Sequence, residues 1–160
     1  MLNLTTLIGW LLFANLTISS RSFTSNGNIP IKYTCEGGNI SPALHIGGIP
    51  AATQSLAIIL QDPDAPMPGG FTHWVAFNID PATDFAENFK GGIQATNGAK
   101  KEGYIGPCPP SGTHHYHFMV YALDSKLSLD KKAGKDALEK AMEGHILSKG
   151  EIVGLYKKSK

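Results

Sequence analysis

Apolar positions recur along the chain in the patterns that β-strands produce. Residues 15–23 alternate between apolar and polar, with Leu16 and Ile18 on one face, as a half-buried strand does. Two later segments, 55–62 and 73–79, are continuous apolar runs bounded by turn residues, which is typical of buried central strands. Further strand candidates are a short segment at 28–35, the apolar end of a turn-rich segment at 35–46, the aromatic-rich segment 114–123, and 151–156.

The apolar period becomes helical only near the C-terminus. Within residues 134–147, five side chains fall at helical spacing: Ala137, Leu138, Ala141, Met142 and His145. Gly150 follows as the expected helix terminator, and 151–156 is the expected final strand. The pattern therefore predicts a mostly β protein with antiparallel strands and one or two peripheral helices, including a C-terminal helix followed by a final strand.

Composition fits one compact domain and excludes some functions. The 160 residues suffice to bury a core, and 42% hydrophobic against 17% charged residues is typical of a globular chain. Lys and Arg number 14 against 13 Asp and Glu, a net charge of +1 that gives no support for nucleic-acid binding. The 18 glycines and 10 prolines indicate many turns and agree with a β-rich fold.

The N-terminus allows two interpretations. Leu7–Ala14 is apolar but too short to span a bilayer, and no Lys or Arg precedes Arg21, so the basic region of a secretory signal is missing. A small-residue site does follow this run, as it would in a signal. Residues 1–15 are thus an apolar extension or a targeting segment, and 16–160 form the domain.

Two cysteines, Cys35 and Cys108, lie far apart in the sequence. In a cytoplasmic protein we expect two reduced thiols, whereas in a periplasmic or otherwise exported protein we expect a disulfide. The compartment therefore stays open together with the N-terminus.

The first candidate for chemistry is DPDAPMPGGFTHW, residues 62–74. Side chains two apart share a strand face, so Asp62 continues the face of the buried strand before it, and Asp64 does so only if the backbone stays extended. The prolines stiffen the segment, which then presents Asp62, Asp64 and His73 at the rim of the sheet. The alternative is a turn in which the aspartates bond their own backbone.

A second segment of the same character is GPCPPSGTHHYHF, residues 106–118. In the strand that follows its Gly/Pro loop, His114, Tyr116 and Phe118 share one face, while the opposite face carries His115, His117 and Met119. Three imidazoles on one extended strand cannot converge, and no other metal-ligand motif is present. We therefore expect no metal and no cofactor.

Together the two segments predict a pocket for a small anion. His73, His114, Tyr116 and the free amides of 106–112 would donate hydrogen bonds, while Asp62 and Asp64 would orient the imidazoles and raise their pKa. Donors would hold the anionic oxygens and a carboxylate would hold a hydroxyl or ammonium group of the same ligand. A phosphate monoester or a phospholipid head group has this chemistry.

These two segments, with YTCEGGNISPAL upstream, resemble the phosphatidylethanolamine-binding protein family, in particular its bacterial and archaeal Raf-kinase-inhibitor-like branch. The resemblance runs from Leu16 to Tyr156 and implies an antiparallel β-sandwich-like core with a small anion pocket. It further implies a disulfide between Cys35 and Cys108 at the pocket rim if the protein is exported, and Phe71 as the candidate for an aromatic pocket residue. The ligand-binding residues that it implies are Asp62, Asp64, His73, Gly106, Pro107, Pro110, His114 and Tyr116.

Two function classes follow. The first is a non-enzymatic binding protein for phosphate-bearing ligands, either phospholipid head groups or phosphorylated partners, with regulation of kinases or proteases and a homodimeric state both left open. The second is a hydrolase that uses an Asp/His pair of the same pocket on a water or serine nucleophile. Ser111 lies near His114 in sequence, but no GxSxG elbow exposes it, which favours the binding protein.

Overall fold

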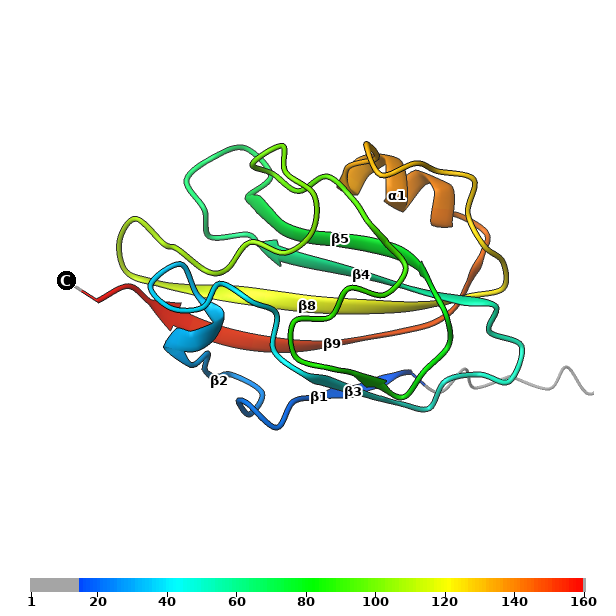
Figure 1. Ribbon diagram of the computed structural model, residues 1–160, viewed down its shortest axis with the longest axis horizontal. Helices are drawn as coiled ribbons and strands as arrows, with labels where there is room; N and C mark the ends of the chain where they lie inside the picture. Colours follow the sequence, from blue (N-terminus) through cyan, green and yellow to red (C-terminus); the bar gives the residue numbers. More distant parts are fainter. Residues whose placement is uncertain (1–14, 160) are drawn as a thin grey trace, which may run out of the picture.

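Two β-sheets of unequal size pack against each other in the computed structural model, which describes residues 15–159 (Figure 1). The larger sheet has six strands in the order β2 (Gly27–Asn28), β9 (Ile146–Lys157), β8 (Thr113–Leu123), β4 (Ser55–Asp62), β5 (Phe71–Ile79) and β7 (Ile93–Gln94). The smaller sheet has the order β1 (Thr17–Ser19), β3 (Leu44–Gly47) and β6 (Asp84–Phe85). All pairs are antiparallel except β2 with β9.

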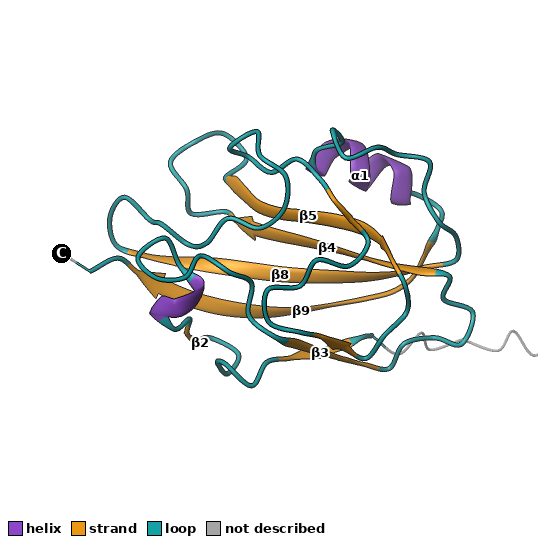
Figure 2. Cartoon of the chain, viewed as in Figure 1, coloured by secondary structure: helices purple, strands orange, loops and turns teal. Residues whose placement is uncertain are grey.

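The part of the chain that the structure describes contains two short, peripheral helices, and loops make up much of the rest (Figure 2). A 3-10 helix, η1 (Ile31–Tyr33), follows β2, and the α-helix α1 (Lys135–Met142) packs on the face of the larger sheet that is turned away from the smaller one. No helix among residues 15–159 is long and apolar enough to cross a membrane. The prediction for Leu7–Ala14 falls on residues outside this described part.

Strand β4 shows why the continuous apolar run forms a central strand. All eight of its residues are buried, and it pairs with β8 on one side and β5 on the other. Leu56, Ile58 and Leu60 face the core between the two sheets, whereas Ala57 and Ile59 face the core under α1. An alternating pattern would have left one face to water, so the run matches burial on both faces.

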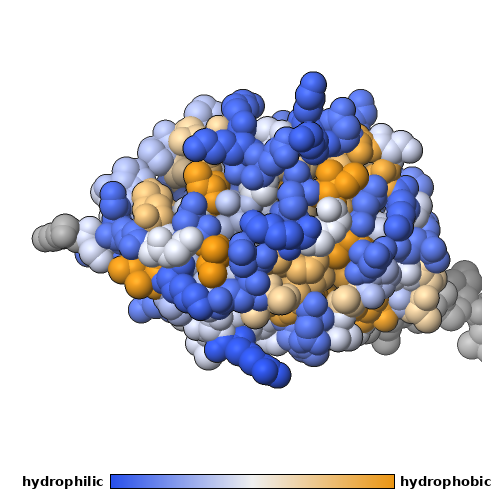
Figure 3. Space-filling model, viewed as in Figure 1, coloured by the Kyte–Doolittle hydropathy of each residue, from blue (hydrophilic) through white to orange (hydrophobic). Residues whose placement is uncertain are grey.

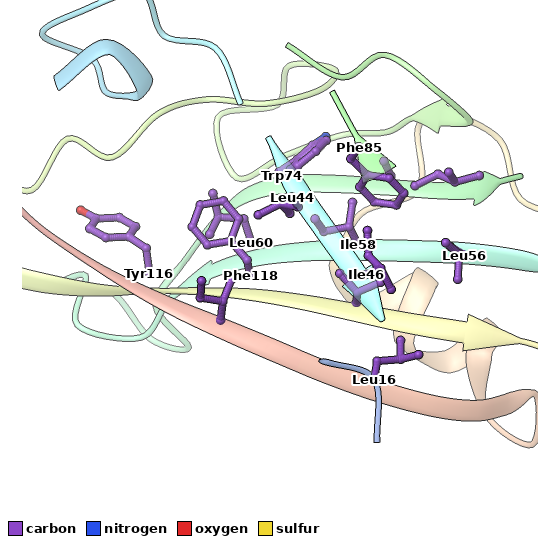
Figure 4. Packing of buried hydrophobic residues seen from close by; sticks show 14 of the residues in the cluster. Leu16, Leu44, Ile46, Leu56, Ile58, Leu60, Trp74, Phe85, Tyr116 and Phe118 are labelled. Carbon is purple, nitrogen blue, oxygen red and sulfur yellow. The ribbon is translucent and has the colours of Figure 1, made fainter. Parts of the chain in front are cut away.

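The main core fills the space between the sheets (Figure 4). Trp74, Phe85 and Phe118 are three of its large aromatic side chains, each 1% exposed or less. The outer surface in the view of Figure 3 is mostly hydrophilic, with apolar side chains in small separate patches. A second, smaller core lies under α1, to which the helix contributes Leu138 and Met142.

The predicted fold class is confirmed, and several element boundaries are corrected. Segment 28–35 is not a strand, because pairing with β9 ends at Asn28 and the chain turns into η1 after Pro30. The strand predicted at 15–23 is limited to Thr17–Ser19.

The predicted helix 134–147 is too long at its C-terminal end. It ends at Met142, and Gly144, at a φ of +77°, turns the chain into β9. Gly150 was expected to terminate the helix but lies within β9, where a Cβ atom would overlap the carbonyl group of Leu16. Glycine is therefore needed at this position for close packing and does not terminate the helix.

Candidate functional site

The two proline-rich segments meet at one end of the larger sheet. β4 runs antiparallel to both of its neighbours, so the end of β4 lies beside the starts of β5 and β8 (Figure 1). This arrangement brings Asp62, the last residue of β4, close to His73 of β5 and His114 of β8. The three come from positions up to 52 residues apart in the chain.

The first loop, 63–70, folds back on the strand it leaves. Gly70 adopts a φ of +73°, and a Cβ atom there would overlap the Asp62 carbonyl oxygen, so only glycine fits this return. The buried Gln61 holds the loop from below, because its Nε2 donates to Gly69 O at 2.8 Å and its Oε1 accepts from the Thr72 hydroxyl at 2.7 Å. Gln61 is a positioning residue that the sequence analysis missed.

The second loop is fastened to the segment that follows η1. The Gly106 N–H donates to Asn39 Oδ1 at 2.6 Å, and the Cys35 N–H donates to Pro107 O at 3.1 Å. A Cβ atom on Gly106 would lie 2.6 Å from the Tyr33 carbonyl oxygen, so the two backbones can approach this closely only with glycine.

Cys35 and Cys108 are joined by a disulfide between these same two segments. Both half-cystines are exposed, and Cys108 also lines the cavity described below. The bridge therefore adds a covalent tether at the rim of the site, in the position that the resemblance implies.

A buried contact between an aspartate and a histidine forms the base of the site. His114 Nδ1 lies 2.8 Å from Asp62 Oδ2, and the two side chains are only 8% and 3% exposed. The other carboxylate oxygen, Oδ1, accepts the Asp64 N–H at 2.9 Å. Asp62 thus orients His114 as expected, and each of its two carboxylate oxygens has a hydrogen-bond partner.

His73 departs from the expectation that carboxylates raise its pKa. Its Nδ1 donates to the Ile105 carbonyl oxygen at 2.9 Å rather than to Asp62 or Asp64. Burial lowers the pKa of His73, and the Ile105 carbonyl and the Asp62 charge offset this only in part. His73 is therefore neutral at pH 7.

Tyr116 contributes a hydroxyl group with no protein partner. The residue is completely buried, and its hydroxyl has no hydrogen-bond partner among the described residues, although Asp62 and the Cys108 amide lie close enough to influence its pKa. Burial, and then the negative charge of Asp62, raise the pKa of Tyr116 far above its ordinary value. Figure 4 shows Tyr116 at one end of the core, with its oxygen turned away from the other labelled side chains.

Asp64 is placed differently from Asp62. Because its N–H bonds back to the Asp62 carboxylate, the chain turns at this point, and Asp64 Oδ2 binds the backbone N–H and Nδ1 of His115, each at 2.8 Å. The alternative of an aspartate turn therefore holds for this pair of residues. The bonds to His115 lower the pKa of Asp64, whose side chain is 41% exposed and does not line the cavity.

A cavity of about 260 Å³ opens above these groups. Of the predicted residues, it is lined by Asp62, His73, Gly106 and Pro110, with Phe71 as well. Cys108, which was expected at the rim, also lines it, and the lining residues that the sequence analysis did not assign to the site are Ala65, Pro66, Met67, Ile105 and Pro109. All but Ile105, which directly precedes the second segment, lie inside the two proline-rich segments, and this position was the signal available for them.

The remaining predicted residues lie behind this wall. Tyr116 packs against the ring of His73 at 5.3 Å and the ring of His114 at 6.4 Å between centroids. Pro107 is buried, and its carbonyl accepts from Cys35. Fewer amides of 106–112 can donate than expected, because the Gly106 N–H is taken and Pro107, Pro109 and Pro110 have none. Ser111 and Gly112 keep theirs, and the Cys108 N–H lies beside the Tyr116 hydroxyl.

The site thus combines an apolar lining with a few convergent polar atoms. The formal charge on the lining is that of Asp62, and the Tyr116 hydroxyl is buried behind the lining. Among residues 15–159, no group of three or more His, Cys, Asp or Glu side chains is arranged to hold a metal ion.

The fold and the cavity define a β-sandwich protein with a small cavity at one end of its larger sheet. A family model described as phosphatidylethanolamine-binding protein matches residues 19–157, and the chain belongs to this family.

Three similar proteins agree with this assignment. The UPF0098 protein PH1269 of Pyrococcus horikoshii is 51% identical over 155 residues, which cover 90% of this chain and 77% of the relative. The crystal structure of CT736, a phosphatidylethanolamine-binding protein homologue from Chlamydia trachomatis, superposes with a TM-score of 0.87 at 37% identity, covering 91% of this chain and 99% of that one. Escherichia coli YbcL, described as a member of the mammalian PEBP family, gives 0.84 at 29% identity, covering 91% and 100%. These relatives confirm the resemblance to the bacterial and archaeal branch.

Proposed function

We propose that this protein binds small phosphate-bearing ligands, such as phospholipid head groups or phosphorylated partners, and does not transform them. The observation that carries the proposal is the Tyr116 hydroxyl, which is buried without a partner beside the Asp62–His114 pair. An unpaired buried hydroxyl costs about 1–3 kcal/mol, so such a group is explained if a ligand oxygen accepts its hydrogen bond. A cavity of about 260 Å³ suits a head group rather than a large molecule.

The lining supports a ligand that is part apolar and part charged. Met67 is 46% exposed at the cavity, and Phe71 and the prolines provide further apolar surface. Polar atoms are few and lie together at the base. This is the usual distribution in small-molecule sites, where apolar contacts exclude water and a few polar groups set the orientation.

A phosphorylated protein, a kinase or protease among the candidates, is the larger ligand that the site could serve. A second groove, lined by Pro110, Ser111, Gly112 and the exposed Lys157 and Lys158, shares Pro110 with the cavity. Acidic residues flanking a phosphorylated side chain would be attracted to these lysines. Proteins captured from a lysate in phosphorylated form only, and lost after phosphatase treatment, would support this extension.

The alternative function is hydrolysis, because a buried carboxylate that orients an imidazole is also half of a catalytic triad. Ser111 lines the neighbouring groove with Lys157 and Lys158 instead of the cavity. The hydrogen-bond partner of His114 Nδ1 is Asp62. Turnover of activated phosphate or acyl esters that disappears in His114→Ala would establish hydrolysis and overturn the binding proposal.

Calorimetric titration with phosphoethanolamine tests the proposal directly. We expect saturable binding by the wild type, at least tenfold weaker binding by His114→Ala, and unchanged binding by His115→Ala. The two variants are matched because the residues are neighbours on β8, and only His114 faces Asp62. Equal effects of the two substitutions, or no binding by the wild type at millimolar ligand, would contradict it.

A further inference from the structure

His73 is held in one tautomer by the fold. Its Nδ1 lies 2.9 Å from the Ile105 carbonyl oxygen, and a carbonyl oxygen can only accept a hydrogen bond, so Nδ1 carries the proton. His73 forms part of the cavity wall, and the Gly106 backbone is the second main-chain group that acts on its ring. The residue is only 5% exposed.

The surroundings of His73 keep the ring neutral. Phe71 packs edge-on at 4.7 Å between ring centroids and Tyr116 at 5.3 Å, and this burial disfavours the imidazolium form. Two ionisable groups act on the ring through their charge, and they oppose each other: Asp62 favours the charged form, and His114 disfavours it. A neutral ring with a protonated Nδ1 presents a lone pair at Nε2, which can only accept.

The charge of the cavity also favours a ligand that donates a hydrogen bond. No Lys or Arg lines it, and the formally charged lining residue is Asp62. When His114 is protonated, it is paired with Asp62 at 2.8 Å, so the pair is neutral as a unit. An oxyanion without any proton would therefore meet a lone pair and a carboxylate with no fixed cation to offset them.

We propose that this cavity selects tetrahedral oxyanions that carry their own O–H or N–H group, which donates to His73 Nε2, and that it rejects fully deprotonated ones such as sulfate. The inference deepens the proposed function and rests on it. In the complex, the Tyr116 hydroxyl donates to an anionic oxygen, while His73 accepts from the protonated part of the ligand. His73 is thus a specificity-determining residue.

Phosphate and sulfate form the decisive pair of probes. They have nearly the same size and shape, but phosphate retains at least one proton at pH 7, whereas sulfate retains none. Calorimetric titrations of the full chain at pH 7 and matched ionic strength should show phosphate binding at least tenfold more tightly. Equal affinities would overturn the inference and leave the proposed function standing, whereas binding of neither anion would overturn both.

Two phosphodiesters identify the source of the proton. Dimethyl phosphate has no acidic hydrogen, whereas glycerophosphoethanolamine has the same charge on phosphate and an ammonium group. Because the second also carries glycerol hydroxyl groups, its binding without the first would support the inference with an ammonium or hydroxyl group outside the phosphate as donor. Binding of phosphate with neither diester would support it with the phosphate O–H as donor, and tight binding of dimethyl phosphate would contradict it.

Substitution and spectroscopy test the role of His73 itself. In His73→Gln the carboxamide offers N–H donors, so the preference for phosphate over sulfate should shrink to about threefold or less. His117→Gln is the control, because His117 lies on the opposite face of β8, paired with Glu151, and should keep the full preference. In the unliganded wild type at pH 7, ¹⁵N NMR should show a protonated Nδ1 and an unprotonated Nε2 on His73. The reverse pattern, or an imidazolium, would overturn the inference without any variant.

Discussion

Replacement of Tyr116 by Phe removes one oxygen atom and should make the unliganded protein more stable. The hydroxyl is completely buried and has no hydrogen-bond partner among the described residues, so its removal loses no intramolecular bond. The penalty for keeping such a group from water is about 1–3 kcal/mol. We expect the free energy of unfolding of Tyr116→Phe to rise by about 1 kcal/mol, the low end of that range.

Tyr104→Phe is the matched control and should change stability in the opposite direction. Its hydroxyl donates to the Tyr33 carbonyl oxygen at 2.6 Å, in the loop region next to the site. Loss of this bond leaves the carbonyl without that donor and should lower the free energy of unfolding by about 1–2 kcal/mol. The two variants delete the same atom, so their difference reports hydrogen bonding rather than the chemistry of the substitution.

Ligand binding should follow the reverse order for Tyr116→Phe. A hydrogen bond to a charged acceptor contributes about 1.5–3 kcal/mol, so the variant should bind phosphate at least tenfold more weakly than the wild type. Urea denaturation without phosphate measures stability, and calorimetry measures affinity. If Tyr116→Phe were destabilised as much as Tyr104→Phe, the hydroxyl would have a partner in the unliganded protein. If its affinity were unchanged, the hydroxyl would not face the ligand.

Three further predictions concern the frame of the site. Replacing Cys35 and Cys108 by Ser should lower the free energy of unfolding by about 4 kcal/mol, because the bridge spans 73 residues and restricts the unfolded chain. Urea titration with and without reductant measures this loss of stability. A loss below about 1 kcal/mol would contradict the prediction. In the same assay, Asp62→Asn should lower the free energy of unfolding by about 3 kcal/mol, because it breaks a buried pair. Asp64→Asn breaks an exposed pair and should lower it by less than about 1 kcal/mol. Equal losses of stability would contradict the role given to burial. Because burial lowers the pKa of His73, the unfolded state binds more protons between that lowered value and about 6.5, so stability should fall as pH drops through this window and be unaffected above it. Thermal unfolding of His73→Gln should show a flatter dependence there, and parallel profiles would disprove the assignment.

The sequence pattern predicts the sheet well where burial alone decides. β4 has the predicted bounds, because a continuous apolar run between turn residues suits only a strand covered on both sides. The two faces of β8 are also as predicted, with Tyr116 and Phe118 in the core between the sheets and Met119 on the other side. A period of two determines these directions locally.

Features that depend on distant contacts could not be predicted. The partner of His73 is a carbonyl oxygen 32 residues away, and no local pattern distinguishes a main-chain acceptor from the nearby carboxylates. The direction of Asp64 depends on a turn in which Asp62 binds the Asp64 N–H, so it leaves the face that an extended chain would have shared. The true end of α1 depends on the pairing of β9 with β8, which starts at Ile146 and overrides the apolar helical pattern.

The occupant of the cavity is the most direct test of the account. A crystal structure of the protein grown with phosphoethanolamine at neutral pH should show a tetrahedral group within hydrogen-bond distance of the Tyr116 hydroxyl. Its proton-bearing part should lie at His73 Nε2. Density only in the groove of Lys157 and Lys158, with the cavity empty at a saturating concentration, would contradict the account.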